Sequence, residues 1–179
     1  MQQGVQQAAG VVSRDELMSR NVLAELQRHP QDKMMLWAHN THVAKAPEQV
    51  EYGDYDMGRF LHQALGNRYR TVGMTFAEGS ALAISVTEPD KGMQAVGLSD
   101  AWPDAPEALM TYRQPAMFLK MAELPRFPVL QDYFSRPQPL RSIGNTAQPG
   151  GLGYNFVVFP EAFDVVVLTQ RSTPATLAR

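Results

Sequence analysis

The sequence contains no cysteine, and this absence excludes several kinds of site at once. Disulfides, thiolate zinc sites, iron–sulfur clusters and cysteine nucleophiles all need that side chain. An excess of charge of one sign is missing too, because 16 Lys and Arg stand against 18 Asp and Glu, a formal net charge of −2. No run of basic residues offers a surface for nucleic acid or a polybasic patch for a membrane. We therefore expect neither of these partners.

Long hydrophobic runs are also missing. The longest lie at 165–168 and around 34–37, far short of the about 20 apolar residues that cross a bilayer. The first dozen residues are rich in Gln, Ala and Gly and lack the basic and apolar segments of a signal peptide. We expect a cytoplasmic protein in which a frayed segment, 1–12, precedes a domain portion spanning 13–179.

What is present suits a packed domain. At 179 residues and 44% hydrophobic composition, the chain is long and apolar enough for one domain or a piece of a larger one. Ser13 followed by Glu16 forms a capping box, which predicts a helix over 13–29 that ends before Pro30. The apolar run 33–39 then predicts a buried strand, in the centre of a sheet.

The rest of the chain alternates between short helical and extended patterns, which indicates an α/β fold with a mixed β-sheet and flanking helices. The predicted elements are an acidic surface loop at 46–56, a helix at 57–65, a hairpin with strands 70–76 and 81–86, a helix at 106–112, a strand at 115–121, a helical turn at 129–134, a loop at 136–153 and a strand at 162–169.

The stretch WAHNTHVAK, residues 37–45, carries the main candidate chemistry. It places His39 at the carboxyl end of the predicted strand, and His42 follows three residues later. Ligands of open α/β sheets bind beyond the carboxyl ends of strands, and imidazole exchanges protons near neutral pH. The pair therefore suits acid–base work or oxyanion stabilisation. The alternative is that both histidines are hydrogen-bonded structural groups.

A metal site is a weaker interpretation of the same histidines. A closed site needs further ligands, and the nearest candidates are acidic residues of the loop that follows: Glu48, Glu51, Asp54 and Asp56. Their acidity is equally explained by solvation of a surface loop, so we expect no metal and no cofactor. Arg14 and Asp15, at the start of the first helix, are placed to face the histidines.

Four blocks of the sequence, in order, resemble the erythromycin esterase-like family: RDELMSRNVLAEL, MMLWAHNTHVAK, MGRFLHQALGNRYRTVGMTF and AFDVVVLTQRSTPA. The resemblance implies an α/β fold around a deep cleft and hydrolysis of an ester, such as a macrolide lactone, by water that a histidine base activates. It implies catalytic roles for His39 and His42, which polarise the carbonyl or steady the oxyanion. It places Asn40, Arg14 and Asp15 on the substrate-binding side, and Trp37 in the core.

One family motif is missing from this sequence. The family's general base lies in a Gly-Glu-x-x-His-Gly motif of an N-terminal half, and here no Gly precedes Glu and no His precedes Gly. The chain therefore resembles the C-terminal part of a larger esterase-like domain. Three hypotheses follow: a hydrolase portion that is inactive alone, a non-catalytic module that binds a small molecule or metal, and a subunit that pairs with a separate N-terminal half or with itself.

Overall fold

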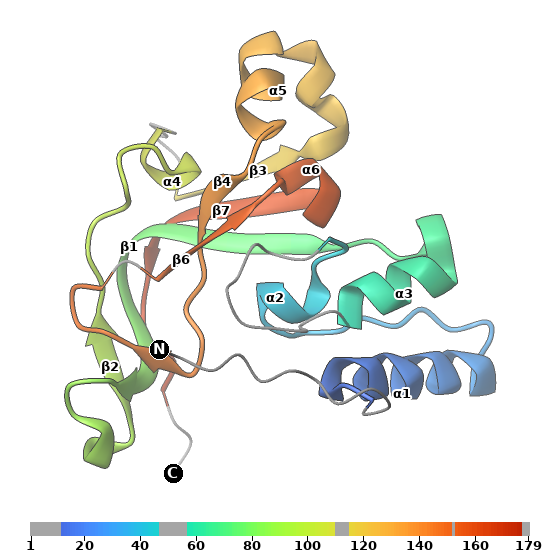
Figure 1. The fold of residues 1–179 in the computed structure, drawn as a ribbon, viewed down its shortest axis with the longest axis horizontal. Coiled ribbons are helices and arrows are strands. Elements are labelled where there is room, and N and C mark those ends of the chain that lie inside the picture. The colour runs from blue at the N-terminus through green and yellow to red at the C-terminus, as the bar shows by residue number, and fades with distance from the viewer. Residues whose placement is uncertain (1–11, 47–56, 110–114, 152, 177–179) are drawn as a thin grey trace, which may run out of the picture.

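The computed structural model describes residues 12–46, 57–109, 115–151 and 153–176, and its centre is a mixed β-sheet (Figure 1). The strands are β1 (Val72–Ser85), β2 (Met93–Gly97), β3 (Ala116–Lys120), β4 (Gln138–Arg141), β5 (Thr146–Ala147), β6 (Tyr154–Val157) and β7 (Val165–Ser172). The α-helices are α1 (Arg14–Arg28), α2 (Asn40–Val43), α3 (Met57–Leu65), α4 (Pro106–Leu109), α5 (Pro128–Phe134) and α6 (Phe159–Ala162). Short 3₁₀ turns lie at Gly66–Arg68, Pro89–Lys91 and Met121–Arg126.

The main sheet has the order β2-β1-β7-β3, with β5 also beside β1, and β4 pairs separately with β6. β1 runs parallel to β7, which aligns Met74 with Val167, whereas β3 and β2 pair antiparallel with β7 and β1. This mixed sheet with helices confirms the predicted fold class. Parallel strands such as β1 and β7 are normally covered on both faces of their sheet.

One face of the sheet is covered by the main core. Val166 and Leu168 of β7 pack there with Phe134 of α5, Phe159 of α6 and Phe163, all of which are fully buried. The aromatic rings of this core meet at centroid distances of 5.0 and 6.4 Å. Burial of such aromatic and aliphatic side chains is the main stabilising contribution to the sheet.

A second, smaller cluster packs α1, α2 and α3 together at one end of the sheet (Figure 1). Val43, Met57 and Leu61 are its buried members. Gly58 lets α3 lie directly against the backbone of α2, since a Cβ there would be 2.3 Å from the carbonyl oxygen of Ala44. Tyr69 adds a hydrogen bond of 2.7 Å to the carbonyl of Val43, and its burial raises the pKa of the phenol to about 12.

The predicted helices are confirmed at α1, which Ser13 caps, at α3 and at α5. The predicted strands 115–121 and 162–169 correspond to β3 and β7. Of the predicted helix 106–112, α4 covers 106–109, and the remainder lies outside the described residues, as do most of 1–12 and 46–56.

The predicted central strand at 33–39 is wrong. The segment is extended without strand pairing, and Met35 and Trp37 are 87% and 82% exposed, so Trp37 is not a core residue either. The apolar pattern of 33–39 predicts burial, but the described part of the chain does not cover this side of the segment.

The predicted hairpin at 70–86 is also wrong, because one continuous strand, β1, runs through it. The turn that the hairpin requires at 77–79 is absent, and Gly79 has a φ of 119° inside the strand. A Cβ at Gly79 would lie 2.1 Å from the carbonyl oxygen of Ser172, so the glycine serves a close strand contact. The predicted loop 136–153 also contains two short strands, β4 and β5.

No helix among the described residues is long and apolar enough to cross a membrane.

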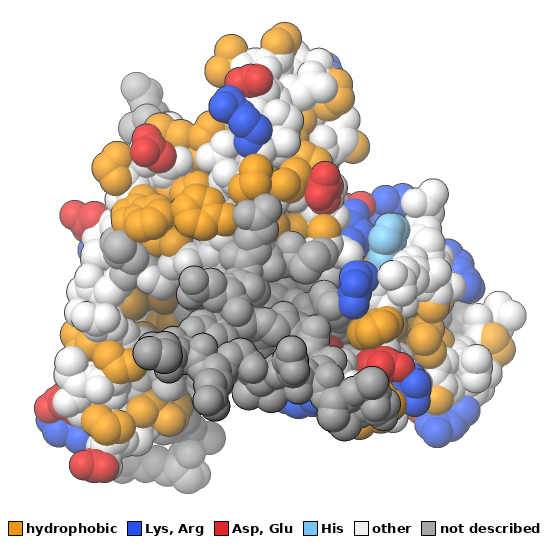
Figure 2. Space-filling view, viewed as in Figure 1, with side chains coloured by type: hydrophobic (Ala, Val, Ile, Leu, Met, Phe, Trp, Pro, Cys, Tyr) orange, Lys and Arg blue, Asp and Glu red, His pale blue; other side chains and the backbone are white. Residues whose placement is uncertain are grey.

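On the face seen in Figure 2, hydrophobic side chains gather in a band beside α4 and below α5, with charged side chains mainly around its margins. Trp102 belongs to the apolar surroundings of β6, where its ring stacks on Tyr154 at 5.0 Å.

Candidate active site

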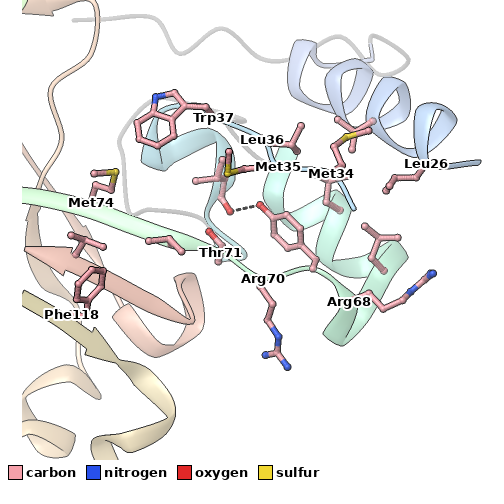
Figure 3. A pocket seen from close by; sticks show the side chains of 17 residues that line it. Leu26, Met34, Met35, Leu36, Trp37, Arg68, Arg70, Thr71, Met74 and Phe118 are labelled. Atoms are coloured by element: carbon pink, nitrogen blue, oxygen red, sulfur yellow. Dashed lines mark hydrogen bonds between the residues drawn. The ribbon is translucent and has the colours of Figure 1, made fainter. Parts of the chain in front are cut away.

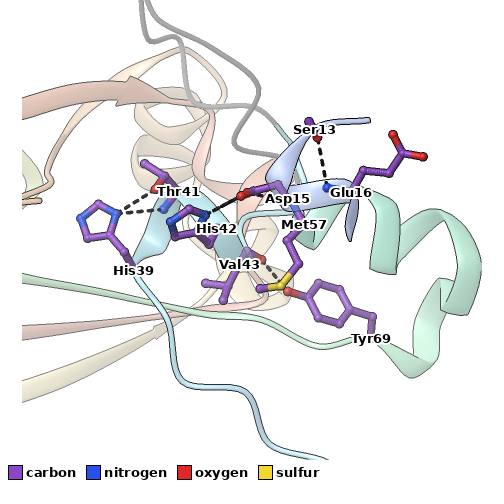
Figure 4. A network of polar contacts seen from close by, with 9 residues as sticks. All are labelled: Ser13, Asp15, Glu16, His39, Thr41, His42, Val43, Met57 and Tyr69. Atoms are coloured by element: carbon purple, nitrogen blue, oxygen red, sulfur yellow. Dashed lines mark hydrogen bonds and ion pairs between the residues drawn. The ribbon is translucent and has the colours of Figure 1, made fainter. Parts of the chain in front are cut away.

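A polar pair joins α1 to α2 through Asp15 and His42 (Figure 4). His42 Nδ1 lies 2.8 Å from one carboxylate oxygen of Asp15 and 3.1 Å from the other. Asp15 is only 2% exposed, and its carboxylate also accepts the backbone N–H of Met57, the first residue of α3, at 3.2 Å. Three helices therefore converge on one carboxylate, which holds the His42 ring in place.

His39 caps the N-terminus of α2 with its own ring. Its Nδ1 accepts the backbone N–H of Thr41 at 3.4 Å and lies 2.8 Å from Thr41 Oγ1. Its Nε2 lies 3.2 Å from Ser142 Oγ, which comes from the chain just after β4. Burial and the neighbouring His42 lower the pKa of His39, so the neutral imidazole is favoured at neutral pH.

Asn40 lies between the two histidines and ties α2 to β1. Its side-chain amide donates to the carbonyl of Met74 at 2.8 Å and its side-chain oxygen accepts the N–H of Met74 at 3.0 Å. The carbonyl of Thr71 accepts from Asp164 and Val165 on the β7 side. Because backbone groups of a strand alternate between its two edges, Met74 faces the opposite edge, where 72–79 has no strand partner among the described residues.

The structure thus brings together four of the five predicted site residues: His39, Asn40, His42 and Asp15. The fifth, Arg14, is the first residue of α1 and its side chain is exposed. The side-chain amide of Asn40 forms hydrogen bonds to the backbone of β1, so in this structure it connects α2 to the sheet.

Two contributors were missed from the sequence. Ser142 and the N–H of Met57 come from segments distant along the chain, and neither carries a motif that could have identified it. No group of three or more metal-ligating side chains occurs within the described ranges, and the acidic candidates Glu48, Glu51, Asp54 and Asp56 lie outside them.

A buried charged network adjoins Ser142. The Arg141 side chain is 2% exposed, donates to the carbonyl of Ser99 at 3.0 Å, and lies over the rings of Phe76 and Tyr154. Glu107, equally buried, accepts the hydroxyl of Thr75 and the backbone N–H of Arg141. Burial raises the pKa of the Glu107 carboxyl.

Beyond α2 lies an apolar groove of about 630 Å³, which separates the segment 33–39 from the uncovered face of the sheet (Figure 3). Val72, Met74, Val167 and Phe118 form its sheet side. Its other walls come from α1, α3 and 34–37: Val22, Leu26, Met34, Met35, Leu36, Trp37, Leu61 and Leu65. Arg68 and Arg70 are also among its lining residues.

The fold of this chain resembles those of solved proteins. A Bacillus cereus protein solved by structural genomics aligns with 92% of this chain at a TM-score of 0.78 and 20% identity, and a succinoglycan biosynthesis protein with 89% at 0.75 and 21%. A mutant of the erythromycin esterase EreC in its open conformation aligns with 87% at 0.60 and 17%. These likenesses establish the fold. No curated protein matches the chain.

The chain spans only 39%, 38% and 36% of those three solved chains, about two fifths of their length. The family model for erythromycin esterase matches residues 2–172, which is nearly all of the sequence. This protein therefore belongs to the erythromycin esterase family.

Proposed function

We propose that the chain supplies the C-terminal part of an ester-hydrolysing site, in which His42 acts as an acid–base group and His39 as a neutral hydrogen-bond donor. The contact that carries the proposal is the 2.8 Å pair between His42 Nδ1 and Asp15. A buried carboxylate can only accept, so Nδ1 of His42 carries a proton, and Nε2 carries the lone pair whenever the ring is neutral. In that arrangement an imidazole can exchange a proton with a reacting group at Nε2.

Asp15 has a second effect on the same step. When His42 takes up a proton, the imidazolium lies against a carboxylate that is 2% exposed, where little water screens the attraction. The carboxylate also fixes the ring orientation through its bond to Met57. Asp15 is therefore a positioning residue for His42, comparable in role to the acidic member of a hydrolase triad.

His39 contributes as a neutral hydrogen-bond donor, whereas His42 contributes by exchanging a proton. Its lowered pKa keeps the ring neutral at pH 7, and a neutral ring N–H can polarise an ester carbonyl and stabilise the developing oxyanion. The chemistry is the addition of water across an acyl C–O bond, which gives a carboxylic acid and an alcohol. We propose a macrolide lactone or a related ester as substrate, on the strength of family membership.

The site is proposed to be incomplete in this chain. The chain covers about two fifths of the solved relatives, and it has no Gly-Glu-x-x-His-Gly motif. The test is hydrolysis of a 14-membered macrolide, followed by mass spectrometry for the water adduct, with the chain alone and with an added N-terminal half. We expect turnover only in the second case.

Variants make this test specific. In the complemented enzyme, His42→Ala and His39→Ala are each expected to lower turnover about 10²-fold, a usual cost of losing an acid–base group or an oxyanion donor. His29→Ala, an exposed histidine at the end of α1, is the matched control. Full turnover by the chain alone would contradict the incomplete site, and binding without turnover would favour a binding module.

A second candidate function, assembly with a separate N-terminal half, is favoured by the groove. Parallel strands are normally covered on both faces, and one face of β1 and β7 is open here, with Phe118 72% exposed. About three fifths of the length of the solved relatives lies outside the region that they share with this protein. We infer that this missing polypeptide, presenting an apolar surface, occupies the groove.

Dye binding and light scattering test the assembly. The chain alone is expected to bind a hydrophobic dye, and Phe118→Glu to reduce the signal, whereas Val129→Glu on exposed α5 leaves it unchanged. An added N-terminal half is expected to form a 1:1 complex and abolish dye binding. A homodimer that excludes the dye would assign the groove to a second copy of the chain instead.

A further inference from the structure

We infer that Ser142 is a positioning residue that fixes the proton of His39 on Nε2. The inference deepens the proposed function, on which its catalytic meaning rests, but its geometry and its test do not depend on any substrate. Ser142 Oγ lies 3.2 Å from His39 Nε2, and Ser142 is separated from His39 by 103 residues. Nothing in the motif 37–45 points to this contact.

The proton positions follow from what each partner can do. The backbone N–H of Thr41 can only donate, and it is directed at Nδ1 of His39 at 3.4 Å. Nδ1 is therefore an acceptor and carries no hydrogen while the ring is neutral, and the Thr41 hydroxyl at 2.8 Å is then the donor of its contact with the same atom. The single ring proton is then on Nε2, where Ser142 Oγ accepts it, and the backbone of Ile143 also lies within hydrogen-bonding reach of the ring.

The backbone of Ser142 is held in place by its surroundings. Its N–H donates to the carbonyl of Gly153 at 2.7 Å, and the preceding residue is the buried Arg141. The Arg141 backbone N–H is bonded to Glu107, and its guanidinium to Ser99 and Tyr154. Because the backbone of Ser142 is fixed, its hydroxyl holds the ring of His39 in one orientation.

This arrangement separates the roles of the two histidines. Asp15 places the proton of His42 on Nδ1, whereas Thr41 and Ser142 place that of His39 on Nε2. The two rings thus carry their protons on different nitrogen atoms, Nδ1 in His42 and Nε2 in His39. An ester oxygen beside Ser142 would share the His39 Nε2–H in a three-centre hydrogen bond.

Nuclear magnetic resonance of the ¹⁵N-histidine-labelled full chain tests the inference without any substrate, and His39→Gln assigns the signals. We expect Nδ1 of His39 to show the ¹⁵N shift of an unprotonated acceptor, and the Nε2–H proton to be slowed in exchange and visible. Ser142→Ala should abolish the visible ring proton, and Ser142→Thr should restore it. Ser135→Ala, at an exposed serine after α5, is the control.

Two results would overturn the inference: a protonated Nδ1 in the neutral ring of the unaltered protein, or an unchanged Nε2–H signal in a folded Ser142→Ala variant. If Ser142→Ala fails to fold, Ser142→Thr and Ser142→Gly are compared, since only the former keeps the hydroxyl. Failure of macrolide hydrolysis with the expected proton signals would reject the proposed function and leave the role of Ser142 intact.

Discussion

At the scale of single residues, the candidate site depends on buried groups with defined proton positions. Asp15 is 2% exposed and accepts from both His42 and the backbone of Met57. The same residue thus contributes to stability and to the proposed chemistry. The bond from Met57 needs only an acceptor oxygen, whereas the pairing with His42 also uses the negative charge of the carboxylate.

Asp15→Asn keeps the size of the side chain and removes its charge. We expect the free energy of unfolding in urea to fall by about 1–3 kcal/mol, the usual cost of an imperfectly satisfied buried group. In the complemented enzyme we expect turnover to fall about 10²-fold, since His42 loses its orienting carboxylate. Asp90→Asn, at an exposed turn residue, is the control; equal stability in both variants would refute the structural role of Asp15.

The pH dependence of stability should carry the signature of His39. Its folded-state pKa is below the ordinary value of 6.5, because burial and His42 disfavour the charged ring. The unfolded chain therefore binds more protons just below that pH, and stability falls as the pH drops from about 6.5 through the lower, folded-state pKa. Urea unfolding between pH 7.5 and 5 measures this loss.

His39→Gln is expected to flatten that part of the pH profile. Glu107 contributes the opposite slope, because burial raises its pKa and the folded state then binds more protons than the unfolded state. The difference between the variant and the unaltered protein isolates His39 from Glu107. Identical slopes in the two proteins would show that His39 titrates alike in both states.

At the scale of elements, the site is a junction of three helices at a sheet edge. α2 has only four residues, so it owes its position to neighbours: Asn40 bonds to β1, Tyr69 bonds to its last carbonyl, and α3 packs against it at Gly58. A helix this short is not stable by itself. Changes in these contacts should therefore move the two histidines.

Gly58→Ala tests the closest of these contacts. The added Cβ would lie 2.3–2.5 Å from backbone atoms of Val43 and Ala44, which cannot move aside as a flexible side chain can. We expect a loss of about 1–3 kcal/mol in unfolding free energy from overpacking. Gly144→Ala adds a Cβ into open space and should change stability little; similar losses in the two variants would argue against the contact.

The sequence predicted elements whose signals are local and missed those that depend on distant partners. The capping box at Ser13 and the β-branched run at 165–167 were sufficient for α1 and β7. Gly79 was misinterpreted because its role is a contact with Ser172, 93 residues away. Ser142 was missed for the same reason, since its pairing with His39 exists only in the folded chain.

At the scale of the whole molecule, the sequence pattern and the structure disagree at one place, the segment 33–39. Its composition is that of a buried strand, yet Met35 and Trp37 are mostly exposed beside the groove. The assembly proposed above would explain the disagreement physically, because a further polypeptide would cover this side.

The fluorescence of Trp37 reports whether a further polypeptide covers this side of the chain. In the chain alone, we expect its fluorescence to be that of a solvated indole, and Trp37→Phe to change unfolding free energy by less than about 0.5 kcal/mol, as for other surface substitutions. Trp102, which stacks on Tyr154, supplies the remaining signal and an internal control. A blue-shifted Trp37 in the monomer, with a large loss of stability in the variant, would show that 33–39 is buried after all.

Asn40 has a bearing on solubility as well as on the site. An open strand edge is a template on which other chains can add strands and build insoluble assemblies. At Met74 both hydrogen-bonding groups of that edge are already taken by the Asn40 amide. An incoming strand would have to displace Asn40 to pair there. The asparagine between the two histidines therefore blocks strand addition at this point of the edge.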